Sequence, residues 1–355
     1  IPETTIDEIL KRTDIVDLIS SYLSLKQASK DYVGLCPFHN EKTPSFSVSP
    51  QKQLYYCFGC GAGGNVIRFM MDINGTSFTE TLEDLGKRVG VDLATVRGNN
   101  GGKSYKKLYE IMDLANSFYN SQLRTSATKE IPIEYLKNRG LSGNVAKKFQ
   151  IGWAPPGWNN ILSYLNKQAI PNSLIMDSGL INESRGKKFD RLRSRITFPI
   201  KNRRGQVLGF GGRVINNDKP KYLNSPETDI FHKGSTIYGI HEATMGQKID
   251  NLIVTEGYLD VISLSQAGLT SVVATLGTAI TKNQLNLLFR ETEHLIFCFD
   301  GDKAGKNAGI KACNISLEML SDNRQIEFCF LDEGDDPDQL VKKVGAKEFF
   351  NHTKK

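Results

Sequence analysis

The chain has 355 residues and a formal net charge of +6. That length allows two or three compact domains. Hydrophobic residues make up 39% and charged residues 24%, a composition that excludes a wholly disordered chain. No apolar run approaches the ~20 residues needed to cross a bilayer, and the N-terminal residues lack the basic and apolar blocks of a secretory signal.

Charge is distributed unevenly along the chain. Residues 185–233 hold thirteen Lys and Arg against four Asp and Glu, a local net charge of +9. Residues 332–338 (DEGDDPD) hold five acids. The two segments together suggest a polyanionic partner and a cation site. An ordinary solvated face remains the alternative for the basic segment.

In chain order, Thr5-Ile-Asp-Glu8 has the form of a capping box and predicts the start of a helix. A turn-rich segment with short strands follows at 32–60, and then a helix at about 65–71. Arg97-Gly-Asn-Asn-Gly-Gly-Lys103 offers no apolar surface to bury. We therefore predict an N-terminal domain at 1–97 and a linker at 98–103.

Beyond the linker a helix is predicted from about Ser104, and strands are predicted at 196–200 and 207–214. After about Asn251 apolar strands alternate with helix-length segments, which indicates βαβ units and a parallel sheet. We predict an α+β multidomain chain: an N-terminal ribbon with helices, then an α/β core. Its parts are a basic subdomain at 104–245 and a parallel-sheet subdomain at 246–355.

Three cysteines and a histidine near the N-terminus have the spacing of a zinc site. Cys36 and His39 form one pair with two intervening residues, and Cys57 and Cys60 form another. Two such pairs close a tetrahedron around Zn²⁺ and leave no open position, so the site is predicted to be structural. Three buried thiols with an unrelated histidine are the alternative. The other cysteines show no disulfide framework, which favours an intracellular protein.

Basic and aromatic side chains surround this cluster. They suit stacking on single-stranded nucleic acid, but they equally suit covering a small metal core. The residues are Lys42, Lys52, Tyr55, Tyr56 and Phe58. Two tryptophans amid prolines, Trp153 and Trp158, are expected to pack in the core rather than to stack on bases.

Three predicted strands end in acids. Parallel sheets carry their sites at the carboxyl ends of strands, and carboxylates that converge there repel one another unless cations join them. Oxygen ligands with open coordination positions suit Mg²⁺ or Mn²⁺ together with substrate phosphate. A solvated loop or a helix N-cap is the alternative for any single pair. The acids are Glu256, Asp260, Asp300, Asp302, Asp336 and Asp338.

These residues resemble a known family. The Glu256-Gly-Tyr-x-Asp260 and Asp300-x-Asp302 pair is similar to the Toprim signature of topoisomerases, primases and some nucleases. Together with CPFHNEKTPSF from Cys36 and CFGCG from Cys57, it resembles the bacterial DnaG-type DNA primases. Further matching stretches are YLKNRGL from Tyr135, GWAPPGW from Gly152, FGGR from Phe210, PKYLNSPET from Pro220 and FHKG from Phe231.

The resemblance implies an enzyme that makes RNA primers de novo on single-stranded DNA from nucleoside triphosphates. It implies one structural zinc on the Cys/His cluster, and two or more Mg²⁺ or Mn²⁺ ions on Glu256, Asp300 and Asp302, supported by the other acids. Residues that match family positions for template or nucleotide binding are Arg139, Arg213, Lys221 and Lys233. The expected partners are template, nucleotides and RNA primer, with no membrane.

Two expectations concern context. Family members act in the bacterial cytoplasm at the replication fork. They also continue into further core helices and a helicase-binding domain, which do not fit in a chain that ends at Lys355, so contact with the replicative helicase is expected only through an absent domain.

Other functions remain open on the sequence. A Toprim nuclease or topoisomerase cleaves strands, and a topoisomerase needs a tyrosine nucleophile; Tyr258 is expected to pack instead. A phosphatase-type nucleophile at Asp300 is a third enzymatic hypothesis. A zinc-ribbon single-strand binder without catalysis is the non-enzymatic one.

Overall fold

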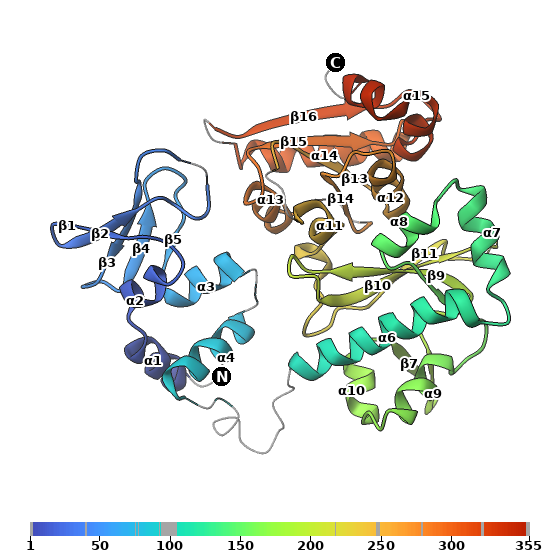
Figure 1. Ribbon diagram of the computed structural model, residues 1–355, viewed down its shortest axis with the longest axis horizontal. Helices are drawn as coiled ribbons and strands as arrows, with labels where there is room; N and C mark the ends of the chain where they lie inside the picture. Colours follow the sequence, from blue (N-terminus) through green and yellow to red (C-terminus); the bar gives the residue numbers. More distant parts are fainter. Residues whose placement is uncertain are drawn as a thin grey trace. The chain divides into compact units, whose positions relative to one another are not determined.

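The structure is a computed structural model, and it describes residues 3–39, 41–74, 76, 78–91, 93, 105–216, 218–245, 249–277, 280–320 and 323–352. The chain divides into two compact units, Ile1–Tyr105 and Lys106–Lys355 (Figure 1). The linker predicted at 98–103 lies outside the described residues. Within the described parts, none of the helices combines the length and the apolar character that a membrane span requires.

The described residues of the N-terminal unit form an antiparallel sheet with helices beside it. The strands lie in chain order across the sheet: β1 (Lys26–Ala28), β2 (Asp31–Gly34), β3 (Phe46–Ser49), β4 (Leu54–Cys57) and β5 (Gly63–Gly64). The helices are α1 (Glu3–Arg12), α2 (Ile15–Ser20), α3 (Val66–Asn74) and α4 (Phe78–Val89). This is the ribbon with helices that the sequence predicts.

An aromatic cluster forms the core of this unit. Phe46 and Tyr55 stack with ring centroids 5.2 Å apart, and Phe69 of α3 meets Tyr55 edge-on at 5.5 Å. The predicted capping box is wrong, because Thr5 already lies inside α1 and is buried. Its hydroxyl is therefore part of the helix packing surface rather than an N-cap.

The C-terminal unit begins with a four-stranded antiparallel sheet in the order β11-β10-β9-β6. Tyr119 of α6 meets Phe210 of β10 edge-on at 5.2 Å, so the long helix packs on this sheet (Figure 1). The strands are β6 (Gly152–Ala154), β9 (Arg195–Lys201), β10 (Val207–Val214) and β11 (Tyr222–Asn224), with a hairpin of β7 (Ile181–Ser184) and β8 (Lys187–Asp190). The helices are α6 (Tyr105–Thr125), α7 (Glu130–Asn138), α8 (Gly143–Lys148), α9 (Asn160–Lys167) and α10 (Asn172–Asp177).

The second part of this unit contains the predicted parallel sheet. Its order is β12-β14-β13-β15-β16; β12 is antiparallel to β14, and the other neighbours are parallel. The strands are β12 (Ile237–Tyr238), β13 (Leu252–Thr255), β14 (Val272–Thr275), β15 (His294–Phe299) and β16 (Gln325–Phe330). The helices are η1 (Lys233–Ser235), α11 (Ile240–Thr244), α12 (Tyr258–Gln266), α13 (Lys282–Phe289), α14 (Lys303–Leu317) and α15 (Pro337–His352).

Helices cover both faces of this parallel sheet. Ile296 and Cys298 of β15 belong to the same apolar cluster as residues of α12 and α15. Phe297 and Phe299, which alternate with them, pack with α13 and α14. The carboxyl ends of β13, β15 and β16 consequently reach one sheet edge, from which the chain enters α12, α14 and α15.

Candidate metal centres

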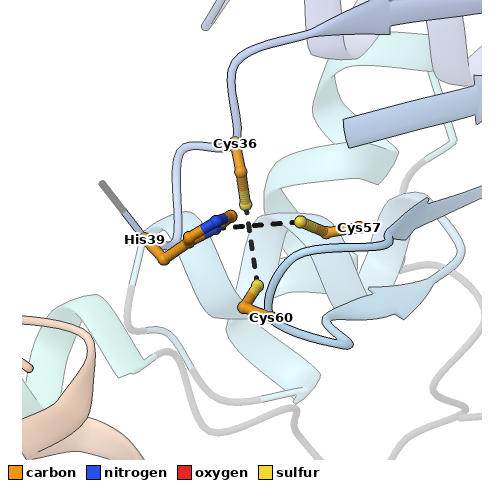
Figure 2. Close-up of side chains that lie close together, drawn as sticks. All are labelled: Cys36, His39, Cys57 and Cys60. Atoms are coloured by element: carbon orange, nitrogen blue, oxygen red, sulfur yellow. Dashed lines mark hydrogen bonds between the residues drawn. The ribbon is translucent and has the colours of Figure 1, made fainter. Parts of the chain in front are cut away.

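The four residues predicted to bind zinc converge in the N-terminal unit (Figure 2). Their ligand atoms all lie within 4.8 Å of one another. The Cys36 and Cys60 sulfurs are 3.8 Å apart, and the Cys57 sulfur is 3.7 Å from Nδ1 of His39. A tetrahedron with metal–sulfur bonds of about 2.3 Å has edges of about 3.8 Å, so this donor set fits zinc.

A hydrogen bond between two of the thiols makes their pKa values differ. The hydrogen bond between Cys36 and Cys60 lowers the pKa of Cys60 to about 5 and raises the pKa of Cys36. Both sulfurs coordinate as thiolates once a metal replaces the shared proton.

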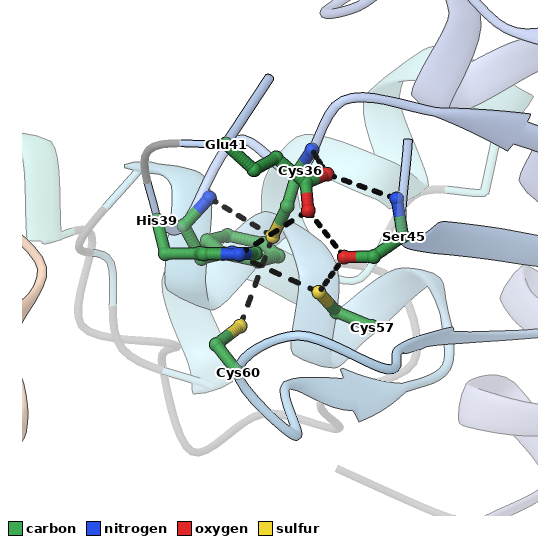
Figure 3. A network of polar contacts seen from close by, with 7 residues as sticks. Cys36, His39, Glu41, Ser45, Cys57 and Cys60 are labelled. Carbon is green, nitrogen blue, oxygen red and sulfur yellow. Dashed lines mark hydrogen bonds and ion pairs between the residues drawn. The ribbon is translucent and has the colours of Figure 1, made fainter. Parts of the chain in front are cut away.

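Glu41, which the sequence analysis did not single out, ties the cluster together (Figure 3). Its carboxylate accepts hydrogen bonds from the Cys36 N–H at 2.7 Å, from the Ser45 N–H at 3.1 Å and from the Ser45 hydroxyl. Burial acts to raise the pKa of Glu41, but these hydrogen bonds outweigh it and lower the pKa. Its second oxygen lies 3.2 Å from Nε2 of His39.

This contact selects the imidazole tautomer. When Nε2–H donates to Glu41, the lone pair of Nδ1 faces the sulfurs. Gly59 lies against the His39 ring, and a Cβ at this position would come within 2.6 Å of Nε2 of His39. The spacing His39-x-Glu41 is the sequence signal that would have pointed to this carboxylate.

The strand β4 separates the surrounding aromatic residues into two groups. Tyr55 and Cys57 point into the core, whereas Leu54 and Tyr56 point outward. Tyr56 is 49% exposed, Phe58 is 77% exposed, and their rings meet edge-on at 5.1 Å. Tyr55 therefore covers the metal core, and Tyr56 and Phe58 stay free to contact a ligand.

The predicted acids meet at the carboxyl edge of the parallel sheet. Glu256 follows β13, Asp300 follows β15, and these strands are neighbours. The backbone N–H of Asp300 donates to Oε1 of Glu256 at 3.4 Å. The other four acids lie at the starts of α12, α14 and α15, at positions 260, 302, 336 and 338.

Burial and mutual repulsion raise the pKa values of carboxyl groups at this edge of the sheet. Burial raises the pKa of Asp300 to about 6, with further contributions from Glu256, Asp336 and Asp302, while Lys221 opposes the rise. Burial also raises the pKa of Glu256 and, more strongly, that of Asp260. Uncompensated carboxylates of this kind are a suitable donor set for hard divalent cations.

The acids are spaced more widely than the zinc ligands. Among the described residues, the Cys/His cluster is the only group of three or more ligand atoms at such close mutual distance. Two acids also serve as helix caps: Asp302 accepts the Gly305 N–H at 2.7 Å, and Asp336 accepts the Gln339 N–H at 2.7 Å. The second oxygen of Asp336 accepts a further hydrogen bond from the Gln339 side-chain amide at 3.2 Å, and Asp302 has a second carboxylate oxygen besides the capping one.

The four predicted basic residues differ in accessibility. Lys221 is exposed and close enough to Asp300 to lower its pKa. Arg139 has a one-third exposed side chain and pairs with Asp338 at 3.3 Å. Arg213 is only 7% exposed and lies over the rings of Tyr135 and Tyr222. Lys233, the fourth of them, lies in η1 and is partly buried.

Tyr258 packs, as expected. Its ring is buried and stacks on Phe198 of β9 at 5.1 Å, and its hydroxyl donates to Asn224 at 2.8 Å. Its pKa is raised by burial. The tyrosine beside the acids is thus a structural joint between the two sheets, unsuited to be a topoisomerase nucleophile.

Three family models match successive parts of the chain. They are the CHC2 zinc finger at residues 1–101, the N-terminal domain of the DNA primase catalytic core at 118–244, and a Toprim-like domain at 253–341. The crystal structure of the Aquifex aeolicus primase, with its zinc-binding and RNA polymerase domains, is 37% identical, with a TM-score of 0.64. The match covers 99% of this chain and 85% of that one.

The chain belongs to the bacterial DnaG-type DNA primase family. A DNA primase of Pseudomonas putida is 47% identical over 98% of this chain and 54% of its own length. That of Escherichia coli K12 is 45% identical over 98% of this chain and 61% of its own length. The chain thus spans little more than half of these primases.

A solved DnaG primase catalytic domain bound to single-stranded DNA is 44% identical, with a TM-score of 0.67, over 70% of this chain and 78% of that one. The family supports two predictions made from the sequence. The architecture is a zinc ribbon followed by a primase core with a Toprim domain. The Cys/His cluster is that of a CHC2 zinc finger, which supports a structural zinc.

Proposed function

We propose that this chain makes RNA primers on single-stranded DNA, joining nucleoside triphosphates by nucleotidyl transfer without a pre-existing primer. The supporting observation is that Glu256 and Asp300, from separate parallel strands, share a hydrogen bond at one sheet edge. The DNA primases to which the chain is similar support the same reaction. Because the chain spans only part of them, the reaction is a proposal for this chain.

In this proposal Glu256, Asp300 and Asp302 hold two or more Mg²⁺ or Mn²⁺ ions, and Asp260, Asp336 and Asp338 support them. Bound there, the ions lower the pKa of the attacking hydroxyl and neutralise charge on the leaving pyrophosphate. Burial and the neighbouring carboxylates raise the pKa values of Glu256, Asp260 and Asp300, and a bound cation would relieve the repulsion among them.

The basic residues capture phosphates in the same proposal. Lys221, exposed beside Asp300, is placed to neutralise a triphosphate. Arg139 and Lys233 serve template or nucleotide, and Arg213 acts from a buried position. On the zinc unit, Tyr56 and Phe58 provide a stacking surface for unpaired template bases.

The remaining expectations complete the proposal. We propose boundaries at 1–97, 98–103, 104–245 and 246–355 for the zinc domain, linker, basic subdomain and Toprim subdomain. Template, nucleotides and RNA primer are the proposed partners in a bacterial cytoplasm at the replication fork.

The test uses Asp300→Asn, with Asp250→Asn as the matched control. Asp250 is an exposed acid ahead of β13. We expect Asp300→Asn to abolish formation of labelled RNA on single-stranded DNA, because it removes a metal-binding charge, while zinc content and DNA affinity stay close to those of the wild type. Asp250→Asn should retain full synthesis.

Two results would contradict the proposal. Undiminished synthesis by Asp300→Asn excludes the acid from the reaction. Nicking or relaxation of supercoiled DNA with Mg²⁺ and no nucleotide, in place of synthesis, assigns the chain to the cleaving members of the Toprim group.

A further inference from the structure

Asp338 differs from the other acids in its contacts. Its side chain is 3% exposed, and Oδ2 lies 3.3 Å from Nη1 of Arg139. The other oxygen, Oδ1, contacts the Lys342 ammonium one turn further along α15. Both oxygens of this carboxylate therefore face cations of the protein itself.

The neighbouring acid Asp336 has different partners. Its two oxygens accept hydrogen bonds from the backbone N–H and the side-chain amide of Gln339, at 2.7 Å and 3.2 Å. Asp336 is thus held at the start of α15, whereas Asp338 pairs with Arg139 at the end of α7.

Arg139 is held from a second direction by an aromatic ring. Its guanidinium lies 5.7 Å from the centroid of Tyr135, one turn earlier in the chain. The buried Arg213 lies over the same ring at 5.5 Å and over Tyr222 at 4.9 Å. Two guanidinium groups share one ring, so the Asp338 carboxylate offsets repulsion that would push Arg139 away.

Arg139 is therefore paired through one nitrogen and still partly exposed to solvent. About a third of the Arg139 side chain remains exposed, while Nη1 is fixed by Asp338. A guanidinium has five N–H donors, so donors remain for a phosphate after this pair has formed.

We propose that Asp338 is a positioning residue: it orients Arg139 toward phosphate groups of template or nucleotide, and it is not a ligand of the divalent ions. This rests on the proposed function, in which Arg139 binds such phosphates. It assigns the acidic cluster two separate tasks, metal binding by the acids around Asp300 and arginine positioning by Asp338.

The first experiment measures metal binding alone. The zinc-loaded chain is titrated with Mn²⁺, and free Mn²⁺ is followed by electron paramagnetic resonance. Asp338→Asn is expected to bind within about twofold of the wild type, whereas Asp300→Asn loses tenfold or more. An equal loss in both variants would overturn the proposal.

The second experiment measures phosphate binding. Anisotropy of a fluorescent single-stranded oligothymidine across a salt series reports template phosphates, and the KM for ATP in primer synthesis reports the triphosphate. Asp338→Asn and Arg139→Gln should each raise either the Kd for the oligothymidine or the KM for ATP about three- to tenfold. The kcat should stay nearly unchanged. If the template is the source, the salt slope falls by about 1.

A double-mutant cycle supplies the decisive comparison. Arg139→Gln/Asp338→Asn should bind phosphate no more weakly than Arg139→Gln, because the carboxylate acts only through the arginine. Additive losses, or normal phosphate binding in Asp338→Asn, would overturn the proposal. Lys347→Gln, at an exposed lysine of the same helix, is the matched control and should leave both assays unchanged.

The same variants distinguish a folding defect from a failure of the proposed function. If Asp338→Asn alone fails to fold, the double variant, which removes the charge imbalance, carries the Mn²⁺ measurement. A wild type that makes no primer but follows the Mn²⁺ and DNA-binding pattern above contradicts the proposed function and leaves the role of Asp338 standing.

Discussion

At the scale of single residues, Asp300 combines a cost in stability with its proposed role in metal binding. Its pKa is raised from 3.8 to about 6, so the folded chain holds this proton more tightly than the unfolded chain does. The free energy of unfolding therefore falls as the pH rises from about 4 to about 6, and the loss persists at higher pH. Glu256 and Asp260 act in the same direction.

Asp300→Asn should accordingly stabilise the metal-free chain at pH 8. We expect a gain of about 1–2 kcal/mol, less than the full shift implies because solvent screens a partly open carboxylate. Chemical denaturation without divalent ions measures it, and the gain should vanish near pH 4. A variant that is less stable than the wild type at pH 8 would show that the carboxylates are not under repulsion.

Glu41→Gln tests the carboxylate behind the zinc ligand. The amide oxygen of Gln can still accept from Cys36 and Ser45, but its NH₂ group cannot accept the proton of Nε2 of His39. We expect a 10- to 100-fold loss of zinc affinity, measured by competition with a chromophoric chelator. Asp17→Asn, at an exposed acid of α2, is the control; affinity within twofold of the wild type would remove Glu41 from the site.

Residue chemistry and spacing predicted which side chains come together, and they predicted exposure less well. The cysteines converge with His39, and Glu256 meets Asp300 at one edge of the parallel sheet. Trp153 is buried as expected, but the expectation for Trp158 is wrong: it is 63% exposed, with Arg193 over its ring at 4.4 Å. Burial of an aromatic depends on distant packing that neighbouring prolines do not reveal.

At the scale of elements, strands were predicted closely. The expected 207–214 strand is β10 itself, and the expected 196–200 strand lies within β9. The strands that were expected to alternate with helices after about Asn251 are those of the parallel sheet. Continuous apolar runs identify buried parallel strands well. The antiparallel edge strand β12 was not predicted, because two residues carry no periodic pattern.

One close approach between elements is directly testable. Gly211 of β10 lies under the ring of Tyr258 of α12, where a Cβ would come within 2.3 Å of Cζ. Gly211→Ala should lower the free energy of unfolding by about 1–3 kcal/mol through overpacking. Gly143→Ala in α8, where a Cβ meets nothing within 4 Å, should be neutral or slightly stabilising. Equal stability of both variants in denaturant titrations would contradict the close contact between Gly211 and Tyr258.

At the scale of the whole molecule, the two units have separate cores. The N-terminal core includes two of the zinc ligands, Cys36 and Cys57, and both tryptophans of the chain lie in the C-terminal unit. Zinc removal by a chelator under reducing conditions should therefore unfold the first unit, seen by circular dichroism, and leave tryptophan emission unchanged. A shift of that emission would show that the second core depends on the metal.

The division into parts illustrates what sequence can supply at this scale. The change to alternating strands and helices predicted the parallel sheet, whereas the linker predicted from a glycine and asparagine run at 98–103 lies outside the described residues. The joint through Tyr258, the pairing of Arg139 with Asp338 and the burial of Arg213 depend on contacts between residues that are far apart in the chain, which local patterns do not encode.

The central claim is that acids from separate strands handle phosphates through divalent ions. It is tested most directly by incubating the zinc-loaded wild-type chain with single-stranded DNA, labelled ribonucleotides and Mg²⁺ or Mn²⁺, with no primer present. The account predicts short labelled RNA that disappears when the divalent ion is omitted. DNA binding without any labelled product, at every ion concentration, would contradict it.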